Sequence, residues 1–252
     1  MRTPHRKSER HSALLILALL IFGLIYMPST LAAEIKTYSA NYSAKFNGME
    51  IEARHQLTQL DSGQYHQTLE ASNILGNISE QATFKLASST EVVPLNYSYK
   101  RSLLGSKRAE KQIFDWPNQQ MQYSKNDRER TIPLKLGYLD IITQRLQLRL
   151  DLQAGKEHFS YPVISRGKLK LYDYEIVSYG ILDTAIGPLN TVQVQRIRKD
   201  NKRQTKIWFA TDWDYLAVKL ELIKDGDSHE MNIIDGQVGN QPVQALEIVT
   251  EK

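Results

Sequence analysis

The histidines are the first residues whose chemistry could support catalysis or metal binding. Four of them lie beyond the N-terminal segment: His55, His66, His158 and His229. The chain has no cysteine and no Gly-x-Ser-x-Gly elbow, so the most common nucleophile signatures are missing. No two of these histidines fall within five residues of each other, which excludes the zinc-binding pair of a metalloprotease helix. We expect each histidine to be a strand or loop residue that faces solvent.

The acidic residues could bind calcium or form a pair of catalytic carboxylates. Two Asp-x-Asp pairs, at 212/214 and 225/227, lack the longer ligand series of a calcium loop, and aspartate is a common turn residue. Carboxylates on expected strands could pair only in three dimensions, and we expect them to face solvent: Asp173, Glu175 and Glu221. Gly-rich phosphate loops are absent. The sequence therefore predicts no catalytic residue, no metal ligand and no cofactor.

The aromatic residues are the remaining candidates for a binding site. The chain has 13 tyrosines and three tryptophans, and most of them fall on expected strands. They could line a cleft for a sugar chain, an acyl chain or a peptide, although sheets also use aromatic residues simply for packing. Those that could line such a cleft are Tyr42, Tyr97, Tyr99, Tyr172, Tyr174, Trp208 and Trp213. Of these, Tyr97, Tyr99, Tyr172, Tyr174 and Trp208 are the candidate ligand-binding residues.

A basic cluster surrounds one expected hairpin in the C-terminal half of the chain. It comprises Arg196, Arg198, Lys199, Lys202, Arg203 and Lys206. Such a cluster could meet an anionic head group, or it could be a solvated hairpin tip that discourages aggregation. Composition and spacing leave both interpretations open.

The N-terminal segment has the three parts of a secretory signal peptide. A basic region containing Arg2, Arg6, Lys7 and Arg10 precedes an uncharged apolar run over 13–26, and small residues follow. The run is too short to span a bilayer as a helix, which needs roughly 20 residues. We expect cleavage near Ala32 and a periplasmic location, with retention as a membrane anchor as the alternative.

The charge balance after cleavage argues against a nucleic-acid partner. Residues 1–32 hold four basic residues and one acidic residue, so 28 of the 32 Lys+Arg and 27 of the 28 Asp+Glu remain. A net charge of +1 gives no general attraction for phosphate backbones. Without cysteine, the remaining chain must be stabilised by its core, for which 33–252 is long enough as a single β-rich domain. No later apolar run predicts a transmembrane span.

Alternation of apolar and polar residues predicts an antiparallel meander. In the C-terminal half, four strand-like runs at 191–197, 205–209, 216–223 and 229–234 are separated by polar turns. Similar runs fill 35–123, with an Asn-Gly turn at 47–48. Residues 126–130 are expected to be a charged loop tip, and Gly180 a turn. A short edge strand is expected at 246–249.

One segment, over 140–152, predicts the helix of the fold. Asp140 can serve as the N-cap, and Ile142, Leu146 and Leu150 recur at helical spacing. Leucines also alternate over 146–152, as in a strand, so that part could adopt either structure. We favour the helix because Leu, Gln and Arg are good helix formers.

Several short motifs, taken in order, resemble a family of exported bacterial proteins. A Tyr-rich strand ends in an Asn-Gly turn over 42–48, and a Pro-x-x-Tyr motif lies at 94–97. The other motifs are an Asp with a Gln-Arg-Leu core (Asp140, Gln144, Arg145, Leu146), a Gly-Pro-Leu-x-Thr-Val motif leading to an arginine (187–196), and a Trp-x-Ala-x-Asp motif before a Val-Lys strand (Trp208, Ala210, Asp212, Val218, Lys219). The family usually has Leu-Pro-Val where this chain has Leu-Ala-Val at 216–218.

The family that these motifs resemble is DUF3108, a domain of unknown function. The resemblance covers nearly all of the chain after residue 32. It implies a β-rich periplasmic protein and supports a helix over 140–152. It supplies no catalytic residue that could be transferred to this chain.

The expected fold is mainly β, an antiparallel meander curved into a half-open barrel or a two-sheet clam, with one helix near its mouth. The preferred function is non-enzymatic binding of an apolar or amphipathic ligand of the cell envelope, such as a lipid. One alternative is a protein-interaction module of an envelope assembly, with an envelope protein as its partner. The other is a polysaccharide-processing enzyme, which would need two buried carboxylates in a cleft.

Overall fold

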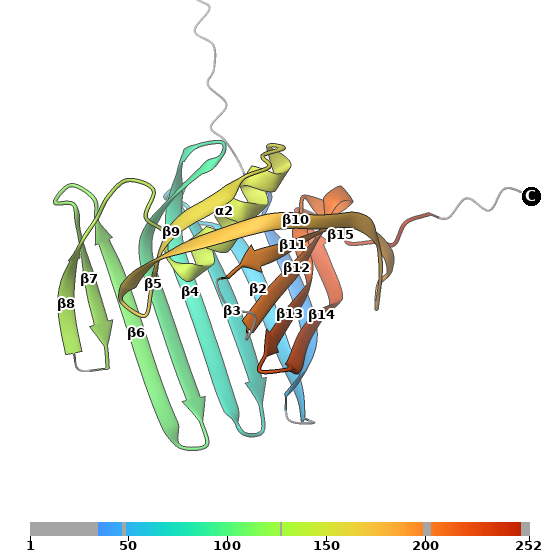
Figure 1. Cartoon of the computed structure of the whole chain (residues 1–252), viewed down its shortest axis with the longest axis horizontal. Coiled ribbons are helices and arrows are strands. Elements are labelled where there is room, and N and C mark those ends of the chain that lie inside the picture. Colours follow the sequence, from blue (N-terminus) through green and yellow to red (C-terminus); the bar gives the residue numbers. More distant parts are fainter. Residues whose placement is uncertain (1–34, 47–48, 127, 199–202, 248–252) are drawn as a thin grey trace, which may run out of the picture. The chain divides into compact units, whose positions relative to one another are not determined.

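The computed structural model describes residues 35–46, 49–126, 128–198 and 203–247. These residues form a large antiparallel sheet and one α-helix, α2 (Figure 1). The first eight strands are β1 (Tyr38–Phe46), β2 (Met49–Gln59), β3 (Tyr65–Asn73), β4 (Gly76–Ser88), β5 (Glu91–Leu103), β6 (Ser106–Asp115), β7 (Gln120–Lys125) and β8 (Arg128–Pro133). After α2 (Ile141–Gln153) come β9 (Phe159–Ser165), β10 (Lys168–Thr184), β11 (Gly187–Ile197), β12 (Arg203–Ala210), β13 (Leu216–Lys224), β14 (Asp227–Val238) and β15 (Gln241–Pro242).

The strands follow one continuous order, β8-β7-β6-β5-β4-β3-β2-β1-β14-β13-β12-β11-β10-β9, and β15 pairs with β14. Strands β8 and β9 are therefore the two edges of the sheet. They do not pair with each other, so the sheet is open. The prediction of a mainly antiparallel β fold with one helix is confirmed. Because the sheet is continuous, the half-open barrel describes it better than the two-sheet clam.

The helix α2 lies on one face of the sheet, which we call the inner face. Figure 1 shows it between β4 and β5 on one side and β9 on the other, and it contacts all three strands. Side chains at alternate positions of β1 and β2 point to this face, including Tyr42, Ala53 and Leu57, which are buried. Residues between them, such as Asn41 and Arg54, lie on the outer face, as the two-residue period of a strand requires.

The helix begins as its sequence predicts. The Asp140 carboxylate accepts hydrogen bonds from the backbone N–H groups of Ile142 and Thr143, at 2.8 and 2.9 Å. The Thr143 hydroxyl in turn accepts one from the Asp140 N–H at 3.0 Å, which completes a capping box. The helix continues through 146–152, so the strand alternative for that part is excluded. Almost every residue from Ile142 to Leu152 is buried, so the helix has no solvent-facing stripe.

The late meander is also confirmed, as strands β11 to β14. Along β13, Leu216 lines the inner face and is fully buried, whereas Leu222, on the same face as Leu220, is 42% exposed. Burial on the inner face therefore decreases with distance from α2. This gradient leaves the far end of the inner face open.

Three local predictions are wrong. The charged tip predicted at 126–130 is shorter, because Arg128 already begins β8. Gly180 lies inside the long strand β10 instead of forming a turn. The short final strand is Gln241–Pro242, and Leu246 and Glu247 are not in a strand; the rest of the predicted 246–249 strand lies outside the described residues.

The predicted signal peptide also lies outside the described residues and stays a prediction. Within the part of the chain that is described, no helix combines the length and the apolar character needed to cross a membrane.

Candidate ligand-binding site

The inner face carries two hollows that follow one another along β2 and β3. The inner cavity, of about 130 Å³, lies beside α2 and is lined by apolar and polar groups, among them Leu69, Leu146, Phe209, Leu216, His55 and Arg149. The groove, of about 440 Å³, lies farther from the helix and is lined mainly by apolar groups, among them Met49, Ile51, Ala71, Ile78, Leu103 and Tyr99. Leu69 and Ala71 are successive inward positions on β3, so the two hollows share one face.

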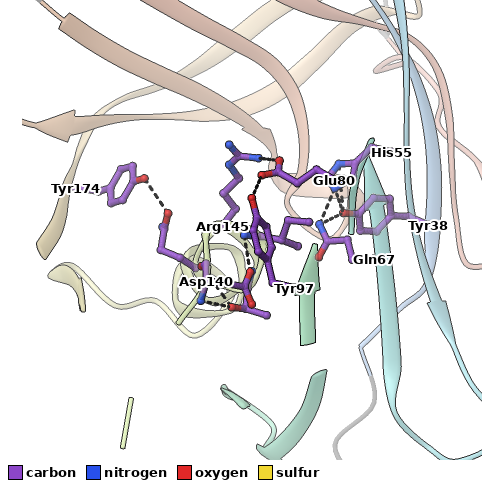
Figure 2. A network of polar contacts seen from close by, with 11 residues as sticks. Tyr38, His55, Gln67, Glu80, Tyr97, Asp140, Arg145 and Tyr174 are labelled. Atoms are coloured by element: carbon purple, nitrogen blue, oxygen red, sulfur yellow. Dashed lines mark hydrogen bonds and ion pairs between the residues drawn. The ribbon is translucent and has the colours of Figure 1, made fainter. Parts of the chain in front are cut away.

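A hydrogen-bonded group of three side chains forms the polar side of the inner cavity (Figure 2). The Gln67 amide donates to the Tyr38 hydroxyl at 3.0 Å and to His55 Nε2 at 2.6 Å. The Tyr38 and His55 rings meet edge to face, with centroids 5.2 Å apart. The bond that Nε2 accepts leaves the imidazole proton on Nδ1.

His55 is held in its neutral form. Burial lowers the pKa of His55 to about 3, and the positive charges of Arg145 and Arg149 act in the same direction. The prediction that His55 faces solvent is therefore wrong. The residue occupies an inward position on β2, between Ala53 and Leu57, and lines the inner cavity. A neutral imidazole here is a hydrogen-bonding group and not a source of charge.

A second polar group ties α2 to the wall formed by β4 and β5. The Tyr97 hydroxyl donates to Glu80 Oε1 at 2.6 Å, and Arg145 Nη1 lies 3.6 Å from Glu80 Oε2 (Figure 2). Burial raises the pKa of Tyr97, and the adjacent Glu80 carboxylate raises it further, so Tyr97 remains a donor. Burial also raises the pKa of Asp140, to about 6, against the hydrogen bonds from Thr143 and Ile142.

The rest of the helix is anchored in the same way. Arg149 forms an ion pair with Asp214, and its guanidinium lies 4.9 Å from the centre of the Tyr38 ring. Near the C-terminal end of the helix, the Asp151 carboxylate accepts from the Tyr161 hydroxyl at 2.8 Å. The charged groups of α2 are thus engaged with the surrounding sheet. Within the described residues, no three acidic or histidine side chains gather as metal ligands would.

The five aromatic candidates do not form one site, because they lie in different parts of the structure. Tyr97 and Tyr174 lie in the polar region around α2, where the Tyr174 hydroxyl donates to Gln144 Oε1 at 3.1 Å. Tyr99 lines the groove. Tyr172 is buried under the Arg196 guanidinium, which lies 3.1 Å from its ring centre. Trp208 lies on the opposite face of β12 from Ile207 and Phe209, with the Lys219 ammonium 5.2 Å from its ring.

The residues that line the inner cavity were largely missed by sequence reasoning. Tyr38, His55, Gln67, Arg145 and Arg149 were not among the candidates. A signal for His55 was present, because it shares the two-residue period of the apolar positions Ala53 and Leu57. A signal for Arg145 and Arg149 was their four-residue spacing, which places them on one side of the predicted helix.

Comparison with known proteins gives the family but no activity. The model of the family described as "Protein of unknown function (DUF3108)" matches residues 40–233. No curated protein sequence matches the chain. The crystal structure of a beta-barrel-like protein with a domain of unknown function, DUF1849, from Brucella abortus is similar, with a TM-score of 0.56 and 7% identity over 81% of this chain and 98% of that one. At that identity the likeness shows the fold alone. Since the family match spans most of the sequence, the chain belongs to the DUF3108 family.

Proposed function

We propose that this protein binds an apolar or amphipathic ligand of the cell envelope on its inner face and catalyses no reaction on it. The observation that carries the proposal is the groove. Its volume of about 440 Å³ falls within the range of small-molecule sites, roughly 300–1,000 Å³, and its walls are mainly apolar. The inner cavity continues the same face toward α2 and is similar in size to an apolar cavity of about 150 Å³ that can hold benzene.

Export to the periplasm is part of this proposal. It is supported by the basic and apolar segments of 1–32, which have the pattern of a signal peptide. A protein in that compartment would meet lipids and other amphiphiles of the envelope. The exposed apolar residues of the groove, such as Ile78, would then be covered by the ligand.

The enzymatic alternative has less support. Two of the buried carboxylates, Glu80 and Glu110, are engaged by Arg145 and Arg108, and these bonds fix their positions. A third, Asp140, caps the helix, and a fourth, Asp151, binds the Tyr161 hydroxyl and Lys156. These roles explain the buried carboxylates as groups that stabilise the fold, so no catalytic role is needed to explain them.

Binding can be tested with the neutral fluorophore N-phenylnaphthylamine and the protein purified from the envelope of cells that express the full chain. We expect a saturable rise in fluorescence. Ala71→Trp fills the groove and should weaken binding about tenfold, which corresponds to about 1.4 kcal/mol. The control Ile74→Trp adds the same ring at a turn position that is 94% exposed.

A second variant guards against misfolding of Ala71→Trp. Ile78→Glu places a charge in the groove at a position that is already 37% exposed, so the fold should tolerate it. It should weaken binding of the neutral fluorophore as well. The proposal is wrong if the wild-type protein shows no saturable binding, or if Ile78→Glu and Ala71→Trp both bind the fluorophore as the wild type does.

A protein-interaction module is the second candidate, because of one specific strand. The part of β10 from Glu175 to Thr184 pairs with β11 alone among the described strands. It carries the exposed residues Val177, Tyr179 and Ile181. An exposed apolar edge can accept a strand from another protein. This candidate would be favoured if Ile181→Lys removed a specific crosslink in the envelope while fluorophore binding stayed unchanged.

A further inference from the structure

Two arginines stand at the border of the groove. Arg101 on β5 and Arg108 on β6 occupy directly opposite positions, and both lie on the inner face. Arg101 lines the groove itself. Like charges in opposite positions of a sheet are unfavourable unless something compensates them. Arg108 has Glu110 as an ion-pair partner, whereas Arg101 has no carboxylate within ion-pair distance among the described residues.

Two further arginines continue the inner face of β11. Arg196 and Arg198 follow the buried residues Val192 and Val194 at the same two-residue period. Neither has a carboxylate partner in the described part of the chain, and burial together with the neighbouring Arg196 lowers the pKa of Arg198. The basic cluster of the sequence is thus divided. Arg196 and Arg198 point inward, whereas Lys206 pairs with Glu221 on the outer face.

Unused hydrogen-bond donors mark the same four arginines. The Nε–H groups of Arg101, Arg108, Arg196 and Arg198 are buried and have no hydrogen-bond partner among the described residues. Buried donors are normally satisfied, because an unsatisfied one costs about 1–3 kcal/mol. An acceptor brought by a ligand would satisfy them.

The helix residue Arg145 links the two walls that carry these pairs. Its guanidinium lies 3.6 Å from Glu80 on β4, and it acts electrostatically on Tyr174 of β10, as Arg196 also does. Positive charge is therefore concentrated around the groove, although residues 33–252 together carry a net charge of only +1. A local excess of one sign within a concave surface attracts ligands of the opposite sign.

We propose that the ligand of the groove is an anionic amphiphile, whose carboxylate or phosphate head group binds at Arg101 and Arg108 while its apolar part lies in the groove. Arg196 and Arg198 contribute positive charge from the other wall. This inference rests on the proposed function. Arginine suits such a head group because its planar donors match the oxygens of carboxylate and phosphate.

The test is displacement of N-phenylnaphthylamine by three ligands that share a dodecyl-length alkyl group and differ in the head group. They are dodecyl phosphate, dodecanoate and dodecanol, all used below micelle-forming concentrations. We expect the two anions to displace the fluorophore at concentrations about tenfold lower than dodecanol. We call the dodecanol concentration divided by the anion concentration, each for half displacement, the displacement ratio. Added salt should reduce this ratio, because the arginines are not fully buried. Inorganic phosphate alone should not displace the fluorophore, which separates an amphiphile site from a site for free phosphate.

Variants on one strand assign the effect to the inner face. Arg101→Gln should bring the ratio close to one, and Arg101→Lys should retain part of it. Lys100→Gln is the matched control, because Lys100 precedes Arg101 on β5 but lies on the outer face and is exposed. Arg108→Gln serves as a second variant if Arg101→Gln fails to fold.

The outcomes separate this inference from the proposed function. Equal displacement by dodecyl phosphate and dodecanol would overturn the anionic head group but leave ligand binding intact. An unchanged ratio in both Arg101→Gln and Arg108→Gln would also overturn the assignment to these arginines. If dodecyl phosphate, dodecanoate and dodecanol all fail to displace the fluorophore, the result would count against the proposed function itself.

Discussion

The Tyr97 hydroxyl donates a 2.6 Å hydrogen bond to the Glu80 carboxylate, on the neighbouring strand. Both groups are buried, and Arg145 of α2 approaches the other oxygen of the same carboxylate. The pair thus joins the sheet to the helix inside the curve of the sheet. It also brings the Glu80 carboxyl group beside Arg145, on the same inner face as Arg101 and Arg108.

Removal of this hydroxyl should destabilise the fold. We expect Tyr97→Phe to lower the free energy of unfolding by about 1.5–3 kcal/mol, the usual range for a hydrogen bond to a charged group. Tyr99→Phe is the matched control, since Tyr99 shares the inner face of β5 and its ring contact with Arg108 does not need the hydroxyl. Urea unfolding of both variants is the measurement. Equal stabilities would show that the Tyr97–Glu80 bond contributes little.

His55 should make the fold sensitive to acid. Its pKa is about 3 in the folded protein but about 6.5 when unfolded, so only the unfolded chain binds a proton between these values. Stability should therefore fall as the pH decreases from about 6.5, by about 2 kcal/mol at about pH 5. His55→Gln keeps a hydrogen-bonding side chain but lacks this titration. If the wild type and His55→Gln lose the same stability over this range, His55 is not held neutral.

Asp140 should have the opposite effect on the pH dependence of stability: its contribution should decrease as the pH rises. Its pKa rises from 3.8 to about 6 on folding, so the contribution of this group is present below the unfolded value and is lost as the pH rises through about 6. Asp140→Asn retains the oxygen that caps the helix and removes the charge. We expect the stability of Asp140→Asn relative to the wild type to increase between about pH 4 and about pH 7, by up to about 3 kcal/mol.

Asp140→Ala provides the control for the cap. It removes the acceptor of both backbone N–H groups and should cost about 1 kcal/mol even where the wild-type carboxyl is protonated. A constant difference between Asp140→Asn and the wild type at all these pH values would contradict the raised pKa.

Much of the fold could be predicted from the sequence, because alternation in a strand directly reports which residues share a face. The capping residue Asp140 likewise marked the start of the helix. The leucines at 146–152 were ambiguous for a physical reason: the helix is enclosed on all sides, so apolar residues do not have to follow a helical stripe.

The partners across the sheet could not be predicted in the same way. Strand β1 pairs with β14, far along the chain, and this joins the N-terminal and C-terminal halves into one sheet. Tyr38 of β1 meets Arg149 of the helix, although strands β2 to β8 lie between the two residues in the sequence. Alternation assigned Tyr38 a face but gave no information on which other element would lie against it.

Gly167 should be essential where the two edges of the sheet approach each other. It adopts a φ of +67°, and its carbonyl accepts a hydrogen bond from Arg130 of the edge strand β8. A Cβ atom there would overlap the Arg130 guanidinium and lie 2.6 Å from the Tyr123 ring. We expect Gly167→Ala to lower the free energy of unfolding by about 2–4 kcal/mol.

The matched control is Gly105→Ala, because Gly105 has a similar φ of +80° but open space around its Cβ position. Its cost should be about 1 kcal/mol, which reports the backbone strain alone. If the two variants are equally stable, the contacts at Gly167 do not hold the edges of the sheet together.

If the proposal is right, the inner face carries a ligand in the cell. The most direct test is mass spectrometry of an organic-solvent extract of the protein. The full chain is expressed in bacteria, and the protein is purified from their cell envelope without detergent. We predict one anionic amphiphile in near-stoichiometric amount, and its loss from Ala71→Trp but not from Ile74→Trp. An extract with no amphiphile, or with the same amount from both variants, would contradict the claim.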